Sequence, residues 1–423
     1  MNKIAIFSHM PQRDRHFDEF LYHELKKRGQ AVWLLQYLQK DFEYLTTIKP
    51  DVVVVPEIRI EYGRDMAWQL KQYGCQVIVR CCEVGITEES IPSITDDYRR
   101  AIFGNWPMNE CLDQMWVWGP RMAKVVAEHG SVDSTKIKEI GSAPFGQYFV
   151  PPPPKLKRPS DKPIVLFATG FAYADRNREH SMPEAFEGED IHTKIIDMDS
   201  AGRSKWLGML PKFVERFKDR WHIQVKAHVG ERKEAYLHIV KDTVQYVNDI
   251  SGFCALQQVD CVVHAGSTMA YEAHLLGKPA FNVHNVCMDV IVSKVSPNFT
   301  DNDKFFEAFD KVEIGKSNAD MGIIETLEGY YGQPDGEAYI RAADLVCGLP
   351  QKKSNIPDEW PPWKIPKYKT KDVVTHAYGW GCSGCGNKYL VLKKREMVKC
   401  PYCGVGNVLA NDADRVKMMG AST

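Results

Sequence analysis

Short apolar runs and amphipathic stretches alternate along the first third of the chain, and this alternation predicts strands and helices in turn. The apolar runs are rich in β-branched residues, as in strands buried within a parallel sheet, and they fall at residues 3–7, 31–35, 51–56, 75–80 and 115–119. Between them, residues 17–29 and 64–73 have the apolar spacing of amphipathic helices. Strands and helices that alternate at this spacing predict a parallel sheet with right-handed crossovers.

A proline-rich run at residues 150–163 interrupts the alternation and predicts an extended linker. A second alternation follows, with expected strands at 164–170, 221–228 and 259–263 and expected helices at 206–218, 234–248 and 269–276. Two open α/β domains joined in this way enclose a cleft between the carboxyl ends of their strands, where ligands bind in such folds. The expected fold class is therefore α/β, with two Rossmann-like domains facing a cleft.

These patterns, together with the cysteine spacing discussed below, divide the chain into six parts. We expect an N-terminal Rossmann-like domain (1–149), a proline-rich linker (150–163), a C-terminal Rossmann-like domain (164–350), a proline-rich basic connector (351–375), a zinc ribbon (376–412) and a tail (413–423).

The stretch at residues 259–283 places a small polar corner, made by Gly266, Ser267 and Thr268, between an expected strand and an expected helix. Ser267 is suited to cap the helix, and Gly277 before a lysine and a proline is typical of its end. At such a corner the first backbone N–H groups are free and the helix dipole is positive. We therefore expect an anion site there, usually for a phosphate.

Polar residues also end the neighbouring expected strands of the second domain, and these are Thr169, Gly170, Lys226, His228 and His264. Glu272 lies one helical turn beyond Thr268, where its carboxylate would accept hydrogen bonds from the hydroxyls of a ribose. A phosphate site with a ribose site one turn deeper describes a nucleotide diphosphate. Each residue alone has an ordinary structural explanation, such as a helix cap or a surface lysine, but their recurrence at successive strand ends favours a binding site.

The composition limits the class of protein. With 423 residues the chain is long enough for two or three domains, and its formal net charge of −1 argues against a generally polycationic nucleic-acid binder while leaving room for a local basic patch.

The first residues lack the apolar region of a signal peptide, and no apolar run approaches the length that spans a bilayer. We therefore expect a cytoplasmic protein, located in the host cytoplasm if it is viral. Of the twelve cysteines, eight are scattered along the chain, and we expect them to be reduced thiols in the core.

The remaining cysteines, Cys382, Cys385, Cys400 and Cys403, form two C-x-x-C-G knuckles on either side of an expected hairpin at 388–399. Two such pairs predict a tetrahedral Cys₄ site for a structural Zn²⁺, although iron also occupies sites of this kind. One interpretation is a metal-dependent staple that closes the second domain or a dimer contact. The other is an acceptor-binding module, because the basic hairpin and the aromatic residues among the connector's lysines suit DNA phosphates and bases.

Several segments resemble, in chain order, the motifs of the surface-carbohydrate-biosynthesis family of GT-B glycosyltransferases. They are RDRHFDEFLYHELKKRG, MWVWGPRMAKVV, KIKEIGSAPF, VKAHVGE and VVHAGSTMAYEAHLLGKPAFNV, and together they cover about residues 1–290. The resemblance implies an N-terminal domain for the acceptor and a C-terminal domain for the nucleotide-sugar donor. It also implies that Ser267 and Thr268 hold the donor phosphates and that Glu272 holds the ribose or the sugar.

The resemblance further matches Lys226 and His228 to the family's basic residue and histidine, although Ala227 and Val229 stand where the family usually has prolines. The zinc ribbon is not a general feature of that family.

The first domain is expected to supply the chemistry, because the loop after its first strand gathers Arg13, Asp14 and His16 toward the cleft. Arg13 would neutralise a leaving diphosphate, and Asp14 or His16 would take a proton from the acceptor. Asp14 alternatively caps the following helix. Glu83, where the resembled family often has an acidic E-G pair, is the first candidate for general base, or for nucleophile if the enzyme retains configuration.

We therefore predict a glycosyltransferase that transfers a hexose or pentose from a nucleotide sugar, such as a UDP-sugar, and that carries Zn²⁺ in its ribbon. The acceptor hypothesis is a hydroxymethylated pyrimidine in DNA, such as 5-hydroxymethylcytosine in a phage-like DNA modification, because a basic ribbon accompanies a chain without a membrane anchor. Transfer to a surface polysaccharide or glycan is the competing enzymatic function. A nucleotide-sugar 2-epimerase and a non-enzymatic zinc-ribbon DNA-binding protein are further alternatives.

Overall fold

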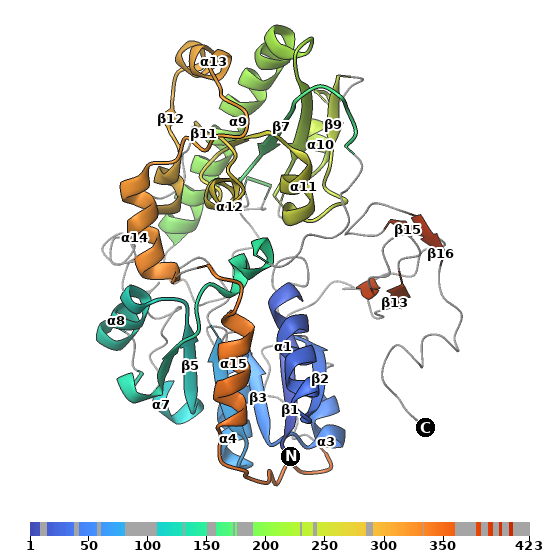
Figure 1. The fold of residues 1–423 in the computed structure, drawn as a ribbon, viewed down its shortest axis with the longest axis vertical. Coiled ribbons are helices and arrows are strands. Elements are labelled where there is room, and N and C mark those ends of the chain that lie inside the picture. Colours follow the sequence, from blue (N-terminus) through green and yellow to red (C-terminus); the bar gives the residue numbers. More distant parts are fainter. Residues whose placement is uncertain are drawn as a thin grey trace.

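The computed structural model describes residues 1–8, 15–37, 42–56, 61–80, 108–129, 132–149, 158–171, 174–175, 189–228, 231–239, 243–284, 291–332 and 334–359, together with four short strands beyond them. The expected α/β class is confirmed, because two parallel sheets with surrounding helices make up the body of the chain. In Figure 1 the first sheet lies in the lower half and the second sheet in the upper half.

The first sheet contains six parallel strands in the order β2-β1-β3-β4-β5-β6. They are β1 (Lys3–Ser8), β2 (Ala31–Gln36), β3 (Val52–Val55), β4 (Gln76–Arg80), β5 (Gln114–Val117) and β6 (Ile137–Glu139). The inner strands β1, β3 and β4 are almost entirely buried, which explains their continuous apolar sequence. The strands predicted in this region are therefore confirmed, and β6 is added at one edge.

Helices link these strands and cover the sheet. They are α1 (Arg15–Lys27), α3 (Tyr44–Ile48), α4 (Glu61–Gln72), α7 (Met108–Cys111) and α8 (Pro120–His129), with the 3₁₀ turns η1 (Ser134–Lys136) and η2 (Ala143–Tyr148). α1 packs through Phe17, Leu21 and Leu25, which recur every fourth residue and are buried. On the same helix, buried Asp18 accepts a hydrogen bond from the guanidinium of Arg80 at 2.9 Å and so ties α1 to the carboxyl end of β4.

The second sheet has six parallel strands in the order β12-β11-β10-β7-β8-β9. They are β7 (Ile164–Ala168), β8 (His222–Lys226), β9 (Val244–Tyr246), β10 (Cys261–His264), β11 (Ala280–Val283) and β12 (Asn298–Phe299). Counted from β7, this is the order of dinucleotide-binding Rossmann sheets. The order reverses between β7 and β10, and the crevice outside the carboxyl ends of those two strands is where such sheets bind ligands.

In the second domain and the crossing segment after it, the described residues form eight further helical elements. They are α9 (Glu189–Phe217), α10 (Glu234–Leu237), α11 (Gly252–Gln258), α12 (Met269–Leu275), η3 (Ile291–Val295), α13 (Asn302–Asp310), α14 (Met321–Tyr331) and α15 (Ala338–Cys347). α9 includes the helix predicted at 206–218 and begins earlier along the chain.

The helix predicted at 234–248 is wrong. Among its described residues, 234–239 and 243–248, the structure has the short α10, followed by the edge strand β9, in which Val244 pairs with Ile223 of β8. Val244 and Val247 are β-branched and buried, so pairing with β8 and burial of these side chains outweigh the weak helical pattern of the segment.

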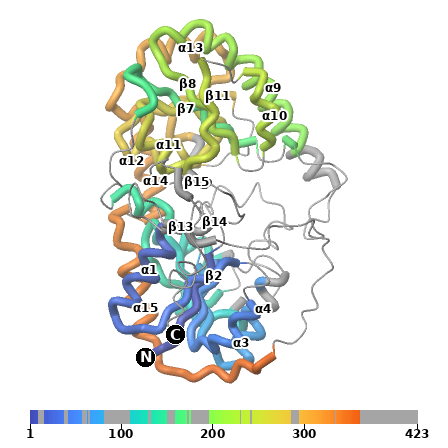
Figure 2. Tube along the Cα trace, turned by 90° about the vertical axis from the view of Figure 1, so that its right-hand side faces the viewer, coloured from blue at the N-terminus to red at the C-terminus, as the bar shows by residue number. Residues whose placement is uncertain are grey.

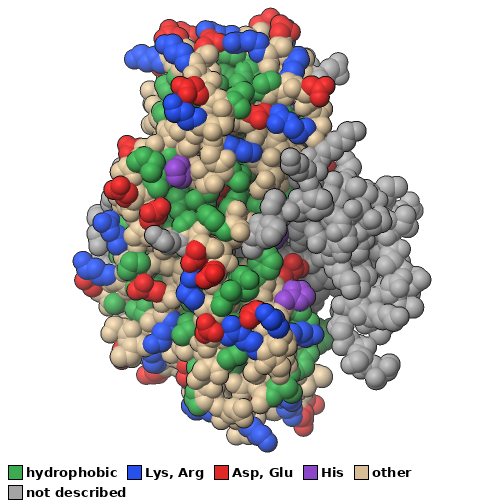
Figure 3. Space-filling view, in the orientation of Figure 1, with side chains coloured by type: hydrophobic (Ala, Val, Ile, Leu, Met, Phe, Trp, Pro, Cys, Tyr) green, Lys and Arg blue, Asp and Glu red, His purple; other side chains and the backbone are tan. Residues whose placement is uncertain are grey.

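The two domains share an apolar core rather than meeting only at a linker. The ring of Phe145 lies 5.0 Å from that of Tyr271 on α12, and Tyr331 on α14 lies 5.4 Å from Tyr271 and 5.3 Å from Trp118 of the first domain. Figure 3 shows apolar side chains at the level where the two domains meet, while cationic and anionic side chains alternate over the rest of that face. These aromatic contacts hold the two sheets in a defined relative position.

The last helix returns to the first domain. α15 packs against α1, as Figure 1 shows, and the chain then runs beneath the first sheet, where it is also seen in Figure 2. The amide of Asn355 donates to the carbonyl of Tyr73, and the side-chain amide of Gln76 donates to the carbonyl of Pro350. The described segment at residues 338–359 therefore lies with the first sheet, although it follows the second along the sequence.

Four short strands lie near the C-terminus. β13 (Tyr378–Gly381) pairs antiparallel with β14 (Lys388–Val391), and β15 (Met397–Lys399) pairs antiparallel with β16 (Gly406–Val408). The hairpin predicted at 388–399 is therefore corrected, because its two strands pair outward with β13 and β16 and not with each other. Each pair of strands is joined by a segment that contains one C-x-x-C motif.

Candidate functional site

The candidate site lies at the point where the strand order of the second sheet reverses, and two loops meet there. The loop after β7 carries Thr169 and Gly170, and the loop after β10 carries the polar corner of Gly266, Ser267 and Thr268. A Cβ atom at Gly170 would lie 2.7 Å from the carbonyl oxygen of Ala265. The two loops therefore touch through their backbones, and only glycine fits at this contact.

The backbone N–H groups of the corner were expected to be free, and the structure contradicts this for three of them. The amide of Gly266 donates to Oδ1 of Asn282 at 3.1 Å, the amide of Ser267 to Nδ1 of His264 at 3.2 Å, and the amide of Met269 to Oγ of Ser267 at 3.2 Å. Gly266 has a φ of 70°, in the left-handed region that favours glycine. These three hydrogen bonds hold the corner in place. Its hydroxyl groups, rather than these amides, are therefore the groups suited to bind a ligand.

α12 begins at Met269, as predicted, but the residue at its cap position is Thr268, whereas Ser267 had been expected to cap it. Ser267 nevertheless accepts the amide of Met269 through Oγ, so its hydroxyl proton can be donated elsewhere.

His264 supports the corner from inside. Its side chain is completely buried, and its Nε2 lies 2.7 Å from Oγ of Ser296. Because Nδ1 accepts the amide of Ser267, the ring proton sits on Nε2 and is donated to Ser296. Burial lowers the pKa of His264 to about 3, so the ring is neutral near pH 7.

Glu272 is half-buried on α12 and is engaged through both carboxylate oxygens. Oε1 accepts the hydroxyl of Thr268 at 3.3 Å, which confirms that the two side chains share a helix face. Oε2 accepts the phenol of Tyr148, which comes from η2 at the end of the first domain. Burial and the charge of Glu272 raise the pKa of Tyr148, so this phenol keeps its proton and acts as a donor. A residue of the first domain therefore orients the carboxylate expected to bind a ribose.

The same interface brings His16 to the site. The ring of His16, at the start of α1, lies 5.7 Å from the ring of Phe253 on α11. Phe253 in turn lies 5.1 Å from the ring of Tyr148. His16 and Glu272 thus belong to one group of contacts that joins the two domains at the carboxyl ends of their strands.

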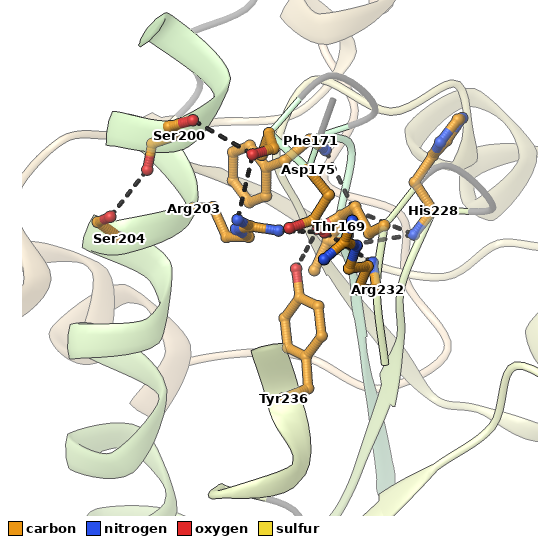
Figure 4. A network of polar contacts seen from close by, with 11 residues as sticks. Thr169, Phe171, Asp175, Ser200, Arg203, Ser204, His228, Arg232 and Tyr236 are labelled. Carbon is orange, nitrogen blue, oxygen red and sulfur yellow. Dashed lines mark hydrogen bonds and ion pairs between the residues drawn. The ribbon is translucent and has the colours of Figure 1, made fainter. Parts of the chain in front are cut away.

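The other predicted donor residues lie at the ends of β7 and β8, and Figure 4 shows two of them, Thr169 and His228, from close by. The side chain of Lys226 turns inward, where its Nζ donates to the carbonyl of Ile250 at 2.6 Å and burial lowers its pKa to about 8. His228 is exposed, and its ring points away from the buried network. Thr169 is buried, and its hydroxyl donates to Glu231 at 2.5 Å. Of these residues, His228 is the one most open to a ligand.

Other predicted site residues lie outside the described residues. They are Arg13, Asp14 and Glu83 in the first domain and the ribbon cysteines Cys382, Cys385, Cys400 and Cys403. Within the described ranges, no group of three or more His, Cys, Asp or Glu side chains is placed to hold a metal ion. In the same part of the chain, no helix combines the length and the apolar character needed to cross a membrane.

Several residues that shape the site were not predicted from the sequence, namely Tyr148, Phe253, Asn282, Ser296 and Tyr236, and Glu231 had been assigned no role. Ser296 and Asn282 contact the corner from a loop and a strand that follow it along the chain, and Tyr148 reaches Glu272 from 124 residues away. Glu231 had one signal, a carboxylate three residues beyond His228 in a strand-end loop.

Two Rossmann-like sheets that meet at the carboxyl ends of their strands, with the C-terminal helix crossing back to the first domain, define the GT-B fold. The expected resemblance to GT-B proteins is thereby confirmed in the fold.

Comparisons with known proteins agree with this fold. Residues 200–328 match a family described as a protein of unknown function (DUF354). The wall teichoic acid polymerase TagF superposes with a TM-score of 0.50 at 14% identity, covering 82% of this chain and 88% of that one. MnaA from S. aureus, solved with UDP, gives a TM-score of 0.50 at 12% identity, covering 82% of this chain and 96% of that one. No curated protein matches the sequence.

Proposed function

We propose that this protein is a glycosyltransferase that uses a nucleotide sugar as donor. The observation that carries the proposal is the junction of three elements at the strand reversal of the second sheet. The loop after β7 touches the corner after β10, and Tyr148 of the first domain binds Glu272 one turn beyond that corner. Such a junction offers hydroxyl donors for a diphosphate beside a carboxylate for a ribose, between two domains.

In this proposal the donor is held by four side chains. The hydroxyl of Ser267 donates to the diphosphate, because the neighbouring backbone amides are already engaged. The hydroxyl of Thr268 joins it by exchanging its bond to Glu272 for one to a phosphate oxygen. The exposed ring of His228 approaches the same phosphates from the end of β8. Glu272 accepts hydrogen bonds from the ribose hydroxyls, with its carboxylate oriented by Tyr148.

Uridine diphosphate is the nucleotide that we propose for the first experiments, since one of the similar structures, MnaA, was solved with UDP. During transfer, a hydroxyl oxygen of the acceptor forms a bond to the anomeric carbon of the sugar. The bond from that carbon to the phosphate oxygen breaks, and the nucleoside diphosphate leaves with the bonding electron pair. The acceptor proton passes to a base of the first domain, for which His16 is the candidate in the interface, with Asp14 and Glu83 as further candidates.

The acceptor that we propose to test first is a hydroxymethylated pyrimidine in DNA, with a surface glycan as the alternative. The support for DNA is the basic and aromatic composition of the connector and ribbon. On the face seen in Figure 3, by contrast, cationic and anionic side chains are mixed, so we assign the DNA contact to the connector and ribbon rather than to this face. The same segment is proposed to bind Zn²⁺ through its four cysteines.

The test is an incubation of the full chain with a panel of UDP-sugars and three acceptors, followed by mass spectrometry. The acceptors are duplex DNA with 5-hydroxymethylcytosine, the same duplex with cytosine, and a polysaccharide. The proposal expects a hexose-sized or pentose-sized mass gain on one acceptor, and loss of that gain in Glu272→Gln. Interconversion of the donor at C2 without transfer would indicate an epimerase instead. An unchanged donor with every acceptor would contradict the proposed activity.

A further inference from the structure

A buried carboxylate lies between the ends of β7 and β8, beside the proposed donor site. The side chain of Glu231 is 8% exposed and receives four hydrogen bonds, shown in part in Figure 4. Oε1 accepts the hydroxyl of Thr169 at 2.5 Å, the amide of His228 at 3.1 Å and the amide of Phe171 at 3.2 Å. Oε2 accepts the phenol of Tyr236. One carboxylate thus joins the loop after β7 to the loop after β8.

Four hydrogen-bond donors around one buried carboxylate are more than the packing of two loops requires. Burying a carboxylate is unfavourable unless several donors compensate for the lost water, and all four donors here are neutral groups. Burial and the nearby charge of Glu231 raise the pKa of Tyr236, so its phenol keeps its proton and remains a donor. Hydrogen bonds to a charged acceptor are stronger than those between neutral groups, so the two loops are held firmly together.

A second carboxylate stabilises the same two loops. Asp175 forms an ion pair with Arg203 of α9 at 2.5 Å and accepts the amide of Arg232 at 2.7 Å, and Figure 4 shows this pair next to the first network. The residues that follow Glu231 and the loop after β7 are therefore both fixed to the long helix of the domain.

The network around Glu231 also fixes the backbone of His228. Its amide is shared between Thr169 and Glu231, while its ring is exposed and points away from the buried groups. The backbone of His228 is thus fixed at the same point that fixes Thr169, the residue before the close-contact glycine of the donor site.

We propose that Glu231 is a positioning residue for donor binding, which fixes the backbone of His228 against the loop after β7 and so directs the His228 ring to the diphosphate. This inference rests on the proposed function, because it takes the diphosphate of a nucleotide as the ligand.

The experiment measures the Kd of UDP by titration calorimetry for the wild type, Glu231→Ala, Glu231→Gln, His228→Ala and the double variant Glu231→Ala with His228→Ala. Glu231→Ala and His228→Ala are each expected to weaken UDP binding by about tenfold, and the double variant by no more than either one, because both changes remove the same interaction. Glu231→Gln keeps the shape and an accepting oxygen, so we expect its Kd within about threefold of the wild type.

Asp301→Ala is the matched control. Asp301 is also a carboxylate that accepts a backbone amide, that of Lys304 at 2.9 Å, but it caps α13, which follows β12 at the opposite edge of the second sheet from β9. Its removal is expected to lower the unfolding temperature and to leave UDP binding unchanged. Independent, additive losses in the double variant, or wild-type affinity in Glu231→Ala, would overturn the positioning role.

A second readout does not depend on UDP. Hydrogen exchange at the amides of Phe171 and His228 is expected to be at least about tenfold faster in Glu231→Ala than in the wild type, with Glu231→Gln close to the wild type. Unchanged exchange at both amides would overturn the inference. If the wild type itself fails to bind UDP while exchange responds as expected, the proposed function fails and the loop-fixing role of Glu231 stands.

Discussion

Replacing Gly170 by alanine tests the close contact between the two loops of the site. The added Cβ would lie 2.7 Å from the carbonyl oxygen of Ala265. Carbon–oxygen contacts in proteins usually lie at about 3.3 Å or more, so the loop after β7 and the corner after β10 must separate by several tenths of an ångström. Forcing an extra methyl group into a packed interior in this way costs about 1–3 kcal/mol.

The assays are thermal unfolding and UDP titration. For a domain of this size, each kcal/mol lost lowers the unfolding temperature by about 2–4 °C. We expect Gly170→Ala to unfold at a lower temperature and to bind UDP more weakly, because the separated loops no longer present the corner correctly. Gly170→Ala with the stability and the UDP affinity of the wild type would refute the reasoning.

Gly208→Ala is the control for this substitution. Gly208 is exposed within α9, and a Cβ atom there would meet nothing within 4 Å. Alanine favours a helix over glycine by about 0.5–1 kcal/mol, so the same chemical change is expected to raise the unfolding temperature slightly and to leave UDP binding unaltered.

Four further predictions follow from other contacts. Because His264 is neutral in the fold, with a pKa of about 3, and titrates near 6.5 when unfolded, protonation favours the unfolded state as the pH falls below 6.5. Stability is expected to fall by about 1.4 kcal/mol per pH unit between about pH 6 and pH 4, and His264→Asn should flatten that slope in pH-dependent denaturant melts. Tyr148→Phe keeps the ring packing but removes the hydrogen bond to Glu272, so UDP should bind about 2–10-fold more weakly, with a loss of about 1–3 kcal/mol in unfolding free energy; equal affinity would contradict this. Arg80→Met removes the guanidinium that pairs with buried Asp18 and is expected to cost about 3–5 kcal/mol in urea unfolding, whereas Lys316→Met, in an exposed ion pair, should cost under about 1 kcal/mol. Elemental analysis of the purified protein is expected to find about one zinc per chain, lost when a ribbon cysteine is replaced by serine; a metal-free protein would contradict the ribbon.

The fold was largely predictable from the sequence because its parallel strands are continuous apolar runs. The strands β1, β3 and β4 are buried on both faces, so their local composition alone identifies them. The helix prediction for residues 234–248 was wrong because Val244 and Val247 contact the edge of β8. A contact with a strand distant in sequence therefore decided the structure of this segment.

The candidate site was predictable in place but not in detail. The polar corner lies where the strand-to-helix pattern indicated, and Thr268 and Glu272 share a face as expected. Two of the corner's amides donate to Asn282 and to the buried ring of His264. No local sequence pattern predicts these hydrogen bonds. The contact of Tyr148 with Glu272 depends on how the two domains meet, which lies beyond sequence periodicity.

The most direct test of the account is a titration of UDP into the wild type and into Glu272→Gln, with unfolding temperatures measured in parallel. The account predicts one UDP per chain for the wild type and binding at least about tenfold weaker for Glu272→Gln at an unchanged unfolding temperature, because the amide cannot replace both accepting oxygens. A wild type that does not bind UDP, or a Glu272→Gln variant that binds it equally well, would contradict the account.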